Sequence, residues 1–537
     1  MNKKNIIIAA GCMLIVQCIS AVATEHRKPN IVFVLIDDMG WTDVGVYGSS
    51  FYETPNIDRL AADGMRFTDA YATCHVCSPS RASILTGKYP ARLGLTDWLQ
   101  GRGDRPYQPL KRASNKQALP MEETTIAEAL REQGYRTGMF GKWHVGEAEG
   151  GPLKQGFDVQ VPQNWYKGWP KAGYHYPFEM DGIEGGKGDY LTDNLTDEAL
   201  RFIEESKDQP FFLYMSYFAV HDPIQGRADL VAKYTEKRRS LPQDDKPFVL
   251  EGNPDAETKF TPEQLDAMIQ TPAYAAYRWL PNRMVKIKQR QDNPQFAAQV
   301  ECVDENIGRL LARLKDLGLD ENTIVIFTSD NGGMSAANLS NDSRNIDPKQ
   351  LDSAYAGSVL PLRGAKGWMY EGGIRVPLIV KWPGKVKAGT ESAEPVIGTD
   401  FYPTILEMVG LPLMPEQHAD GVSLAPILGK QKGLGRDAIY WHFPHYSNHG
   451  LQSPGAAIRS GQYKLLEYFE NGTVQLFDLS EDLGEQNDLS KMRPEIVKHL
   501  LEKLQKWRDE VGAKMMPPNP GYDSNVKPEE LYKSKNK

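Results

Sequence analysis

The sequence predicts an α/β protein with a mostly parallel sheet flanked by helices, followed by a smaller C-terminal antiparallel sheet with a packed helix. Continuous apolar runs rich in Val, Ile and Phe alternate with helical patterns over most of the chain, as expected for a buried parallel sheet. After roughly residue 435 the pattern changes to short alternating runs around Asn471-Gly472, which is a strong hairpin signal. At 537 residues the chain exceeds what one hydrophobic core usually supports. We therefore expect domains at 24–435 and 436–537.

The first 23 residues have the pattern of a secretory signal peptide. Lys3 and Lys4 precede an apolar run over residues 6–19, and Ala21-Val22-Ala23 supplies a cleavage site. The run is too short for a comfortable membrane span, so no stable membrane insertion is expected. Cys18 leaves a lipoprotein anchor as an alternative, but Gln17 before it argues against one. The sequence thus predicts a secreted or periplasmic protein.

The formal net charge is −8, and it becomes about −10 once the two lysines of the signal segment are removed. An acidic chain is not expected to bind nucleic acid, so any attraction for an anion must come from cations gathered in a pocket. Three cysteines remain in the mature chain, of which Cys74 and Cys302 either pair or stay buried and free. The free alternative is favoured because buried free cysteine is common.

Four predicted strands end in polar residues. Because ligands bind at the carboxyl ends of strands in open α/β sheets, these residues are candidates for the functional site. The strands at 31–36, 136–140, 211–220 and 323–328 lead respectively into Asp37-Asp38, into Lys142 and His144, into His221, and into Asp330-Asn331.

The remaining elements follow from periodicity and composition. Residues 299–317 and 494–511 place apolar side chains at helical spacing, which predicts two amphipathic helices. Residues 225–294 lack strong strand runs and are interpreted as a helical or irregular insertion around the rim of the site. Residues 455–460, 463–469 and 473–479 are the expected strands of the C-terminal sheet.

The segment Cys77-Ser78-Pro79-Ser80-Arg81 carries the most specific signal. Pro79 suits the first turn of a helix and Gly87 suits its end, so Cys77 would lie at a helix N-terminus, where an anion is favoured. A redox pair or zinc ligands at Cys74 and Cys77 are the alternatives. No second Cys/His pair lies at matching distance, and neither alternative explains Pro79 and Arg81.

This pattern, Cys-x-Pro-x-Arg, resembles the nucleophile motif of the formylglycine-dependent sulfatases, and the resemblance extends over roughly residues 29–513. It implies an alkaline-phosphatase-like fold. It also implies that a maturing enzyme oxidises Cys77 to formylglycine, whose hydrated aldehyde attacks sulfate esters.

The polar strand ends gain roles from the same resemblance. Asp37, Asp38, Asp330 and Asn331 offer only oxygen ligands, which suit a hard cation, and the resemblance implies that they hold one Ca²⁺ together with modified Cys77. The alternatives are turns or helix caps.

The resemblance also assigns the groups that handle charge and protons. Arg81, Lys142 and Lys366 would surround the sulfate. His221 and Lys366 would act on the leaving-group oxygen, and His144 on the hydroxyl that remains on the sulfated aldehyde hydrate. Imidazole suits such work because it titrates near neutral pH.

Residues 440–446 and 457–459 resemble those of a sulfatase branch that acts on sulfated galactose or N-acetylgalactosamine of glycans. The resemblance favours sulfate at the 4-O position. Sulfate at the 6-O position and general arylsulfatase activity are the alternatives. A phosphate-ester hydrolase on the same fold is disfavoured because serine or threonine and histidine-rich zinc ligands would be expected. A catalytically silent glycan-binding protein would be expected to lack a metal or proton-transfer position.

The candidate sugar contacts, for which local packing is the alternative, are Trp98, Arg102, His442 and His445.

Overall fold

The structure is a computed structural model that describes residues 27–146, 150–164, 170, 172–242, 246–271, 279–337, 354–429 and 433–526. The predicted signal peptide lies outside these residues. Within them, no helix is both long and apolar enough to cross a membrane.

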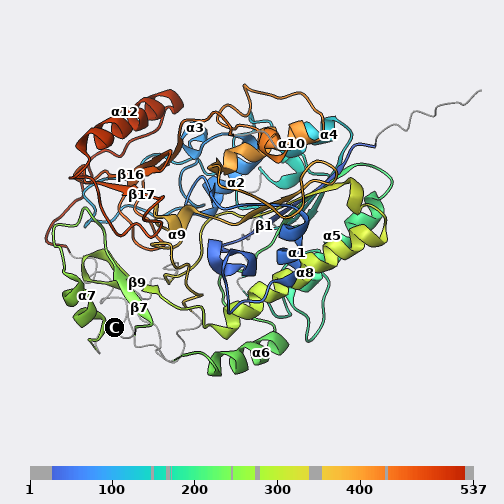
Figure 1. Ribbon diagram of the computed structural model, residues 1–537, viewed down its shortest axis with the longest axis horizontal. Coiled ribbons are helices and arrows are strands. Elements are labelled where there is room, and N and C mark those ends of the chain that lie inside the picture. The colour runs from blue at the N-terminus through green and yellow to red at the C-terminus, as the bar shows by residue number, and fades with distance from the viewer. Residues whose placement is uncertain are drawn as a thin grey trace, which may run out of the picture.

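A mixed, mostly parallel sheet forms the centre of the molecule, and its strand order is β12-β2-β11-β10-β1-β6-β4-β5 (Figure 1). The five strands from β10 to β5 run parallel, whereas β11 is antiparallel to both its neighbours. This confirms the predicted fold class. The bounds are β1 Asn30–Ile36, β2 Met65–Phe67, β4 Arg136–Gly141, β5 Val159–Val161, β6 Phe211–Ser216, β10 Thr323–Ser329, β11 Leu378–Lys381 and β12 Thr390–Ser392, with β3 Ala70–Tyr71 and β13 Val396–Ile397 pairing separately.

Helices cover both faces of this sheet, and β1 explains why. Its alternating side chains enter two different cores: Val32 and Val34 belong to one, Ile31 and Phe33 to the other. In Figure 1, α1, α5 and α8 lie below the sheet and α2, α4 and α10 above it. The helices on these faces are α1 Pro55–Asp63, α2 Cys77–Thr86, α4 Ile126–Glu132, α5 Leu191–Ser206, α8 Pro294–Asp316 and α10 Phe401–Met408, and shorter ones are α3 Pro90–Leu93, α9 Glu371–Ile374 and α11 Ala425–Leu428.

Two predicted bounds differ from the structure by more than one residue, the start of the helix predicted at 299–317 and the end of the strand predicted at 211–220. Helix α8 begins at Pro294 because the Asn293 side chain accepts hydrogen bonds from the next backbone N–H groups, a cap that precedes the predicted apolar stripe. Strand β6 ends at Ser216, four residues before the predicted end, and the chain beyond it donates from Tyr217 N to the Leu35 carbonyl at the end of β1.

The insertion over 225–294 is only partly as predicted. It contains helices α6 Ala228–Arg239 and α7 Pro262–Ile269, but also a three-stranded antiparallel sheet in the order β7-β9-β8. The strands are β7 Phe248–Glu251, β8 Trp279–Leu280 and β9 Met284–Lys288. All three are short, and β7 and β9 contain charged residues, so the sequence has no long apolar run that would have predicted them.

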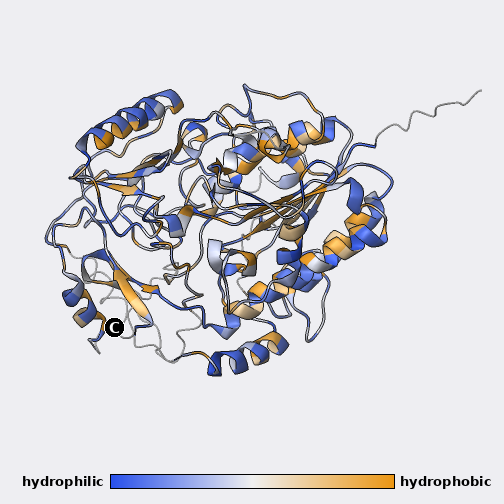
Figure 2. Ribbon diagram, in the orientation of Figure 1, coloured by the Kyte–Doolittle hydropathy of each residue, from blue (hydrophilic) through white to orange (hydrophobic). Residues whose placement is uncertain are grey.

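The C-terminal part forms an antiparallel sheet with strand order β14-β15-β16-β17, and the hairpin turns at Asn471-Gly472 as predicted. Its amphipathic helix has the predicted bounds. In Figure 2 one side of this helix, α12, is orange and the opposite side blue. The elements are β14 Ile439–Phe443, β15 Gly455–Ser460, β16 Tyr463–Tyr468, β17 Val474–Asp478 and α12 Pro494–Val511.

Candidate functional site

Cys77 is the first residue of α2, and the whole helix is buried. The helix ends at Gly87, whose φ of 71° is left-handed and where a Cβ would approach His418 Cβ to 2.4 Å. The predicted bounds of this helix are therefore correct. The side chain of residue 77 is held at the positive end of a helix, where negative charge is stabilised.

His144 lies directly against Cys77. Its Nδ1 is 3.1 Å from Cys77 Sγ, and its Nε2 is 2.9 Å from the Leu99 carbonyl oxygen. A carbonyl only accepts, so Nε2 carries the proton and Nδ1 presents a lone pair to residue 77. Burial, assisted by the charge of Lys142, holds the pKa of His144 well below its usual range. This histidine is thus a neutral acceptor at the nucleophile position.

The acidic strand ends meet because β1 and β10 are parallel neighbours, with Ile36 opposite Ser329. The Asp38 N–H donates to Asp330 Oδ1 over 3.2 Å, and Asn331 Nδ2 donates to Asp38 Oδ1 over 2.8 Å. Asp37, Asp38, Asp330 and Asn331 are all completely buried.

Three cations face these carboxylates. Arg81 Nε is 2.8 Å from Asp330 Oδ2, and Lys142 Nζ is 2.6 Å from Asp37 Oδ2. Lys366 Nζ is 2.7 Å from Asp38 Oδ2. Burial favours the neutral form of Asp37, but the charges of Lys142, His221 and Arg81 together hold its pKa well below the usual range. Burial and the neighbouring Asp37 instead raise the pKa of Asp330.

Arg81 is fixed by more than charge. Its Nη1 donates to the Lys142 carbonyl and to Ser216 Oγ, over 2.8 and 2.6 Å, and Ser216 Oγ also donates to that carbonyl. The guanidinium thus links α2 to the ends of β4 and β6. Ser216 and the Leu99 carbonyl were missed from the sequence, because their roles depend on which strands become neighbours.

His221 lies on the other side of the acidic cluster. Its Nδ1 is 2.8 Å from the Asp222 carbonyl oxygen, so this nitrogen carries a proton, and Nε2 is 3.6 Å from Asp38 Oδ2. Burial and Lys366 act to lower its pKa, but Asp38 and Asp222 outweigh them and raise it to about 9. In this arrangement a raised pKa thus favours the protonated form of His221, whereas a lowered pKa favours the neutral form of His144.

The acidic cluster fits a metal ion. Atoms of Asp37, Cys77 and Asp330 lie within 4.8 Å of one another. Asp37 Oδ1 and Asn331 Oδ1 are buried and accept no hydrogen bond, so each has an unused lone pair. A set of three carboxylates and one amide suits a hard divalent cation.

His449 is a site residue that the sequence did not reveal. It is buried, its Nδ1 has no hydrogen-bond partner, and its ring centroid lies 6.3 Å from that of Trp98. Burial, with smaller contributions from Lys366 and His221, holds its pKa well below the usual range. A neutral imidazole therefore lies close enough to Lys366 and His221 for their charges to act on it.

The four predicted sugar contacts separate into two pairs. Trp98 is half-buried next to His449, and the charge of Arg102 also acts on His449. His442 and His445 are buried, with Nε2 atoms 2.9 Å from the Lys514 carbonyl oxygen and 2.8 Å from Thr96 Oγ1. These contacts favour the packing alternative for both histidines.

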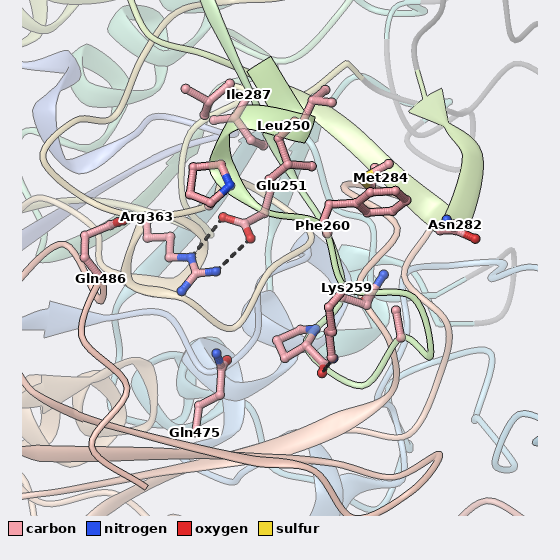
Figure 3. A pocket seen from close by; sticks show the side chains of 18 of the residues that line it. Leu250, Glu251, Lys259, Phe260, Asn282, Met284, Ile287, Arg363, Gln475 and Gln486 are labelled. Carbon is pink, nitrogen blue, oxygen red and sulfur yellow. Dashed lines mark hydrogen bonds and ion pairs between the residues drawn. The ribbon is translucent and has the colours of Figure 1, made fainter. Parts of the chain in front are cut away.

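A cavity of about 980 Å³ lies apart from the residues described so far (Figure 3). It is lined by the insertion sheet, α7 and the loop before Lys366, and the ion pair between Glu251 and Arg363 crosses it. None of the proton-transfer or metal-site residues lines it. The reactive groups instead form a compact buried cluster at the carboxyl edge of the sheet.

Comparison with known proteins agrees with this geometry. Residues 29–411 match the family model described as Sulfatase, and residues 365–510 match one described as N-sulphoglucosamine sulphohydrolase, C-terminal. The chain is 30% identical to a sulfatase of Formosa agariphila, over 94% of each chain. It is also 30% identical to N-acetylgalactosamine-6-sulfatase of Rattus norvegicus, over 82% of this chain and 72% of the relative. A solved structure of a protein with its substrate D-glucosamine-2-N,6-O-disulfate is 25% identical and covers 90% of this chain and 98% of its own, with a TM-score of 0.66.

Proposed function

The chain belongs to the sulfatase family and is a sulfuric ester hydrolase, and on this premise we propose that it removes sulfate from galactose or N-acetylgalactosamine units of glycans. The observation that carries the proposal is the position of Cys77. It begins a buried helix, lies 3.1 Å from a neutral histidine, and adjoins a cluster containing Arg81, Lys142 and Lys366.

Cys77 is the proposed site of conversion to formylglycine by a maturing enzyme. The hydrated aldehyde would supply one hydroxyl that attacks sulfur and a second that can later lose its proton. His144 is the proposed acceptor of a proton from this position, because its Nδ1 faces residue 77 while its Nε2 donates to the Leu99 carbonyl.

His221 and Lys366 are the proposed donors to the sugar oxygen that leaves. Both contact Asp38, and both carry a proton at neutral pH in this structure. The opposed protonation of His144 and His221 supports a base on the nucleophile side and an acid on the leaving-group side.

Arg81 and Lys142 stabilise negative charge without taking part in proton transfer. Arg81 is held rigidly by Asp330, Ser216 and the Lys142 carbonyl, so little reorganisation is needed when charge develops nearby.

Asp37, Asp38, Asp330 and Asn331 are the residues that would hold Ca²⁺, together with modified Cys77. A bound calcium ion would supply Lewis-acid polarisation of a sulfate oxygen. The unused oxygens of Asp37 and Asn331 support this assignment.

The sugar is proposed to lie against Trp98, with the imidazole of His449 bonded to a ring hydroxyl. Sequence resemblance favours a 4-O-sulfate. The second candidate is a 6-O-sulfate, which the names of the rat relative and of the structural neighbour's substrate favour. Export is proposed from the 23 N-terminal residues.

The test is a desulfation assay on protein produced with a maturing enzyme and Ca²⁺. Galactose and N-acetylgalactosamine carrying 4-O- or 6-O-sulfate are compared with a phosphate ester and with an aryl sulfate. We expect one sulfated sugar to be preferred and the phosphate ester to be inert. Hydrolysis of the aryl sulfate alone would overturn the proposed sugar class, and preferential phosphate hydrolysis would overturn the proposed reaction.

A further inference from the structure

A small polar pocket adjoins the loop that supports the nucleophile. It measures about 380 Å³ and is lined by residues of 97–101 and 111–117 together with His445. The same loop contacts the surroundings of Cys77 and lines the pocket. Leu99 donates to Ser78 Oγ and accepts from His144, whereas Gln100 and Gly101 line the pocket. The pocket is therefore separated from the nucleophile by the thickness of one loop.

Two cations give the pocket its charge. Lys111 and Arg112 are exposed and line it, and within the described chain neither forms an ion pair with a carboxylate. By contrast, the nearby Lys88 and Arg92 pair with Glu123 and Asp420. In an acidic protein, two cations without carboxylate partners create a local attraction for anions.

The acid of the lining offsets this charge only in part. Asp97 is buried and accepts from the Trp98 N–H over 2.8 Å, and burial raises its pKa to about 7. Gln100, Ser114 and Gln117 add uncharged polar groups to the lining. Such a mixture suits an acidic group carried on a polyhydroxylated molecule better than a bare ion or an apolar ligand.

Arg102 connects this pocket to the catalytic cluster. Its carbonyl accepts from Arg112 Nη1 over 2.8 Å, and its charge acts on His449, which lies beside Lys366. Arg102 therefore contacts a residue of the pocket and lies close enough to His449 for its charge to act there.

We propose that this pocket binds the anionic group, a carboxylate or a second sulfate, of the sugar unit next to the one that is desulfated. The inference rests on the proposed function and extends it to the substrate class, which becomes an acidic oligosaccharide.

The test compares three disaccharides that share the same sulfated N-acetylgalactosamine. The three disaccharides differ in the second sugar, which is glucuronic acid, sulfated galactose or neutral galactose. The readout is the ratio of kcat/KM for each charged substrate to that for the neutral one. Wild type should favour at least one charged substrate by about tenfold, the factor expected for a hydrogen bond to a charged group. The charged substrate that is preferred distinguishes carboxylate from sulfate.

In the double variant Lys111→Gln/Arg112→Gln the ratio should fall close to one. The matched control is Lys491→Gln/Lys498→Gln, which removes the same charge from exposed positions at α12 and should keep the wild-type ratio. A wild-type ratio near one, or a ratio that the double variant leaves unchanged, would overturn the proposal.

A binding measurement separates this inference from the proposed function. Calorimetry with the unsulfated glucuronic acid disaccharide needs no turnover, and the double variant should bind it about tenfold more weakly than wild type. If none of the sulfated sugars is hydrolysed but this difference is found, the proposed function fails and the anion pocket stands. If the sugars are hydrolysed but neither the binding nor the ratio responds to the double variant, the pocket proposal fails alone.

Discussion

The proposed catalytic cluster and a second buried cluster around Glu371 both pair carboxylates with Lys and Arg, but they differ in whether the oxygens of the central acidic residues all have a partner. Glu371 Oε2 accepts from Arg375 and Tyr71, and its Oε1 lies 2.9 Å from Lys464 Nζ. Lys464 also contacts Glu485 over 2.8 Å. In the catalytic cluster, Asp37 Oδ1 and Asn331 Oδ1 accept no hydrogen bond. Both oxygens of Glu371 are therefore paired where the C-terminal sheet meets α9, whereas Asp37 and Asn331 each keep an oxygen that could bind a metal ion at the carboxyl edge of the central sheet.

The largest expected effect comes from Cys77→Ala. It should lower kcat on the order of 10⁴- to 10⁶-fold, as removal of a catalytic nucleophile does. The thermal midpoint should barely change, because the substitution removes only one small polar group at residue 77. Kinetic assays and thermal unfolding of both proteins check this, and full activity in the variant would contradict the proposed chemistry.

The cluster around Glu371 should respond in the opposite way: a substitution there should lower the stability of the protein. Lys464→Met leaves the buried Glu485 without its cation, beside Glu371, which keeps its ion pair with Arg375. This should cost about 3–5 kcal/mol of unfolding free energy. Denaturant unfolding measures the loss. Lys503→Met, which breaks the exposed pair with Asp437, is the matched control and should cost at most about 1 kcal/mol. Equal losses in the two variants would contradict the stabilising role of the buried cluster around Glu371.

The proposed catalytic cluster should gain stability when Ca²⁺ binds to its unpaired oxygens. Ca²⁺ at about 100 times its Kd should raise the unfolding free energy of wild type by about 2.7 kcal/mol. Asp330→Asn should remove most of this gain and lower activity by about 10²-fold. Calorimetric unfolding with and without Ca²⁺ tests both, and stability indifferent to Ca²⁺ in wild type would count against the metal site.

The buried, neutral His442 should have a smaller effect, which appears in the pH dependence of stability. Burial lowers the pKa of His442 to about 4, below its unfolded value near 6.5, so the unfolded chain binds the extra proton first. The stability from this residue is present above pH 6.5 and is lost as pH falls toward 4, by about 2 kcal/mol at pH 5. His442→Gln should flatten that part of the stability profile. An unchanged slope would contradict the packing role.

The smallest effect is expected at His449. His449→Ala should raise KM for the sulfated sugar by about 3- to 10-fold through loss of one hydrogen bond, with kcat changed less. Steady-state kinetics separates the two terms. A loss confined to kcat would instead place His449 in the chemical step.

Much of this arrangement could be predicted because its strands and helices are formed by continuous stretches of sequence with clear patterns. The runs that became β1, β4 and β10 each end at the polar residues proposed for the site, and Pro79 and Gly87 marked the helix of Cys77. The insertion sheet was missed because its strands are short and contain charges. Ser216, His449 and the Leu99 carbonyl were missed because each acts through neighbours distant in sequence. The roles of the site residues in turnover remain predictions.

The central claim is that residue 77 is no longer a cysteine in active protein. Mass spectrometry of the peptide that contains residues 73–81, from protein that turns over a sulfate ester, tests it most directly. The account predicts loss of the thiol mass in favour of an aldehyde or its hydrate. A peptide that retains unmodified Cys77 throughout, in protein that still turns over, would contradict it.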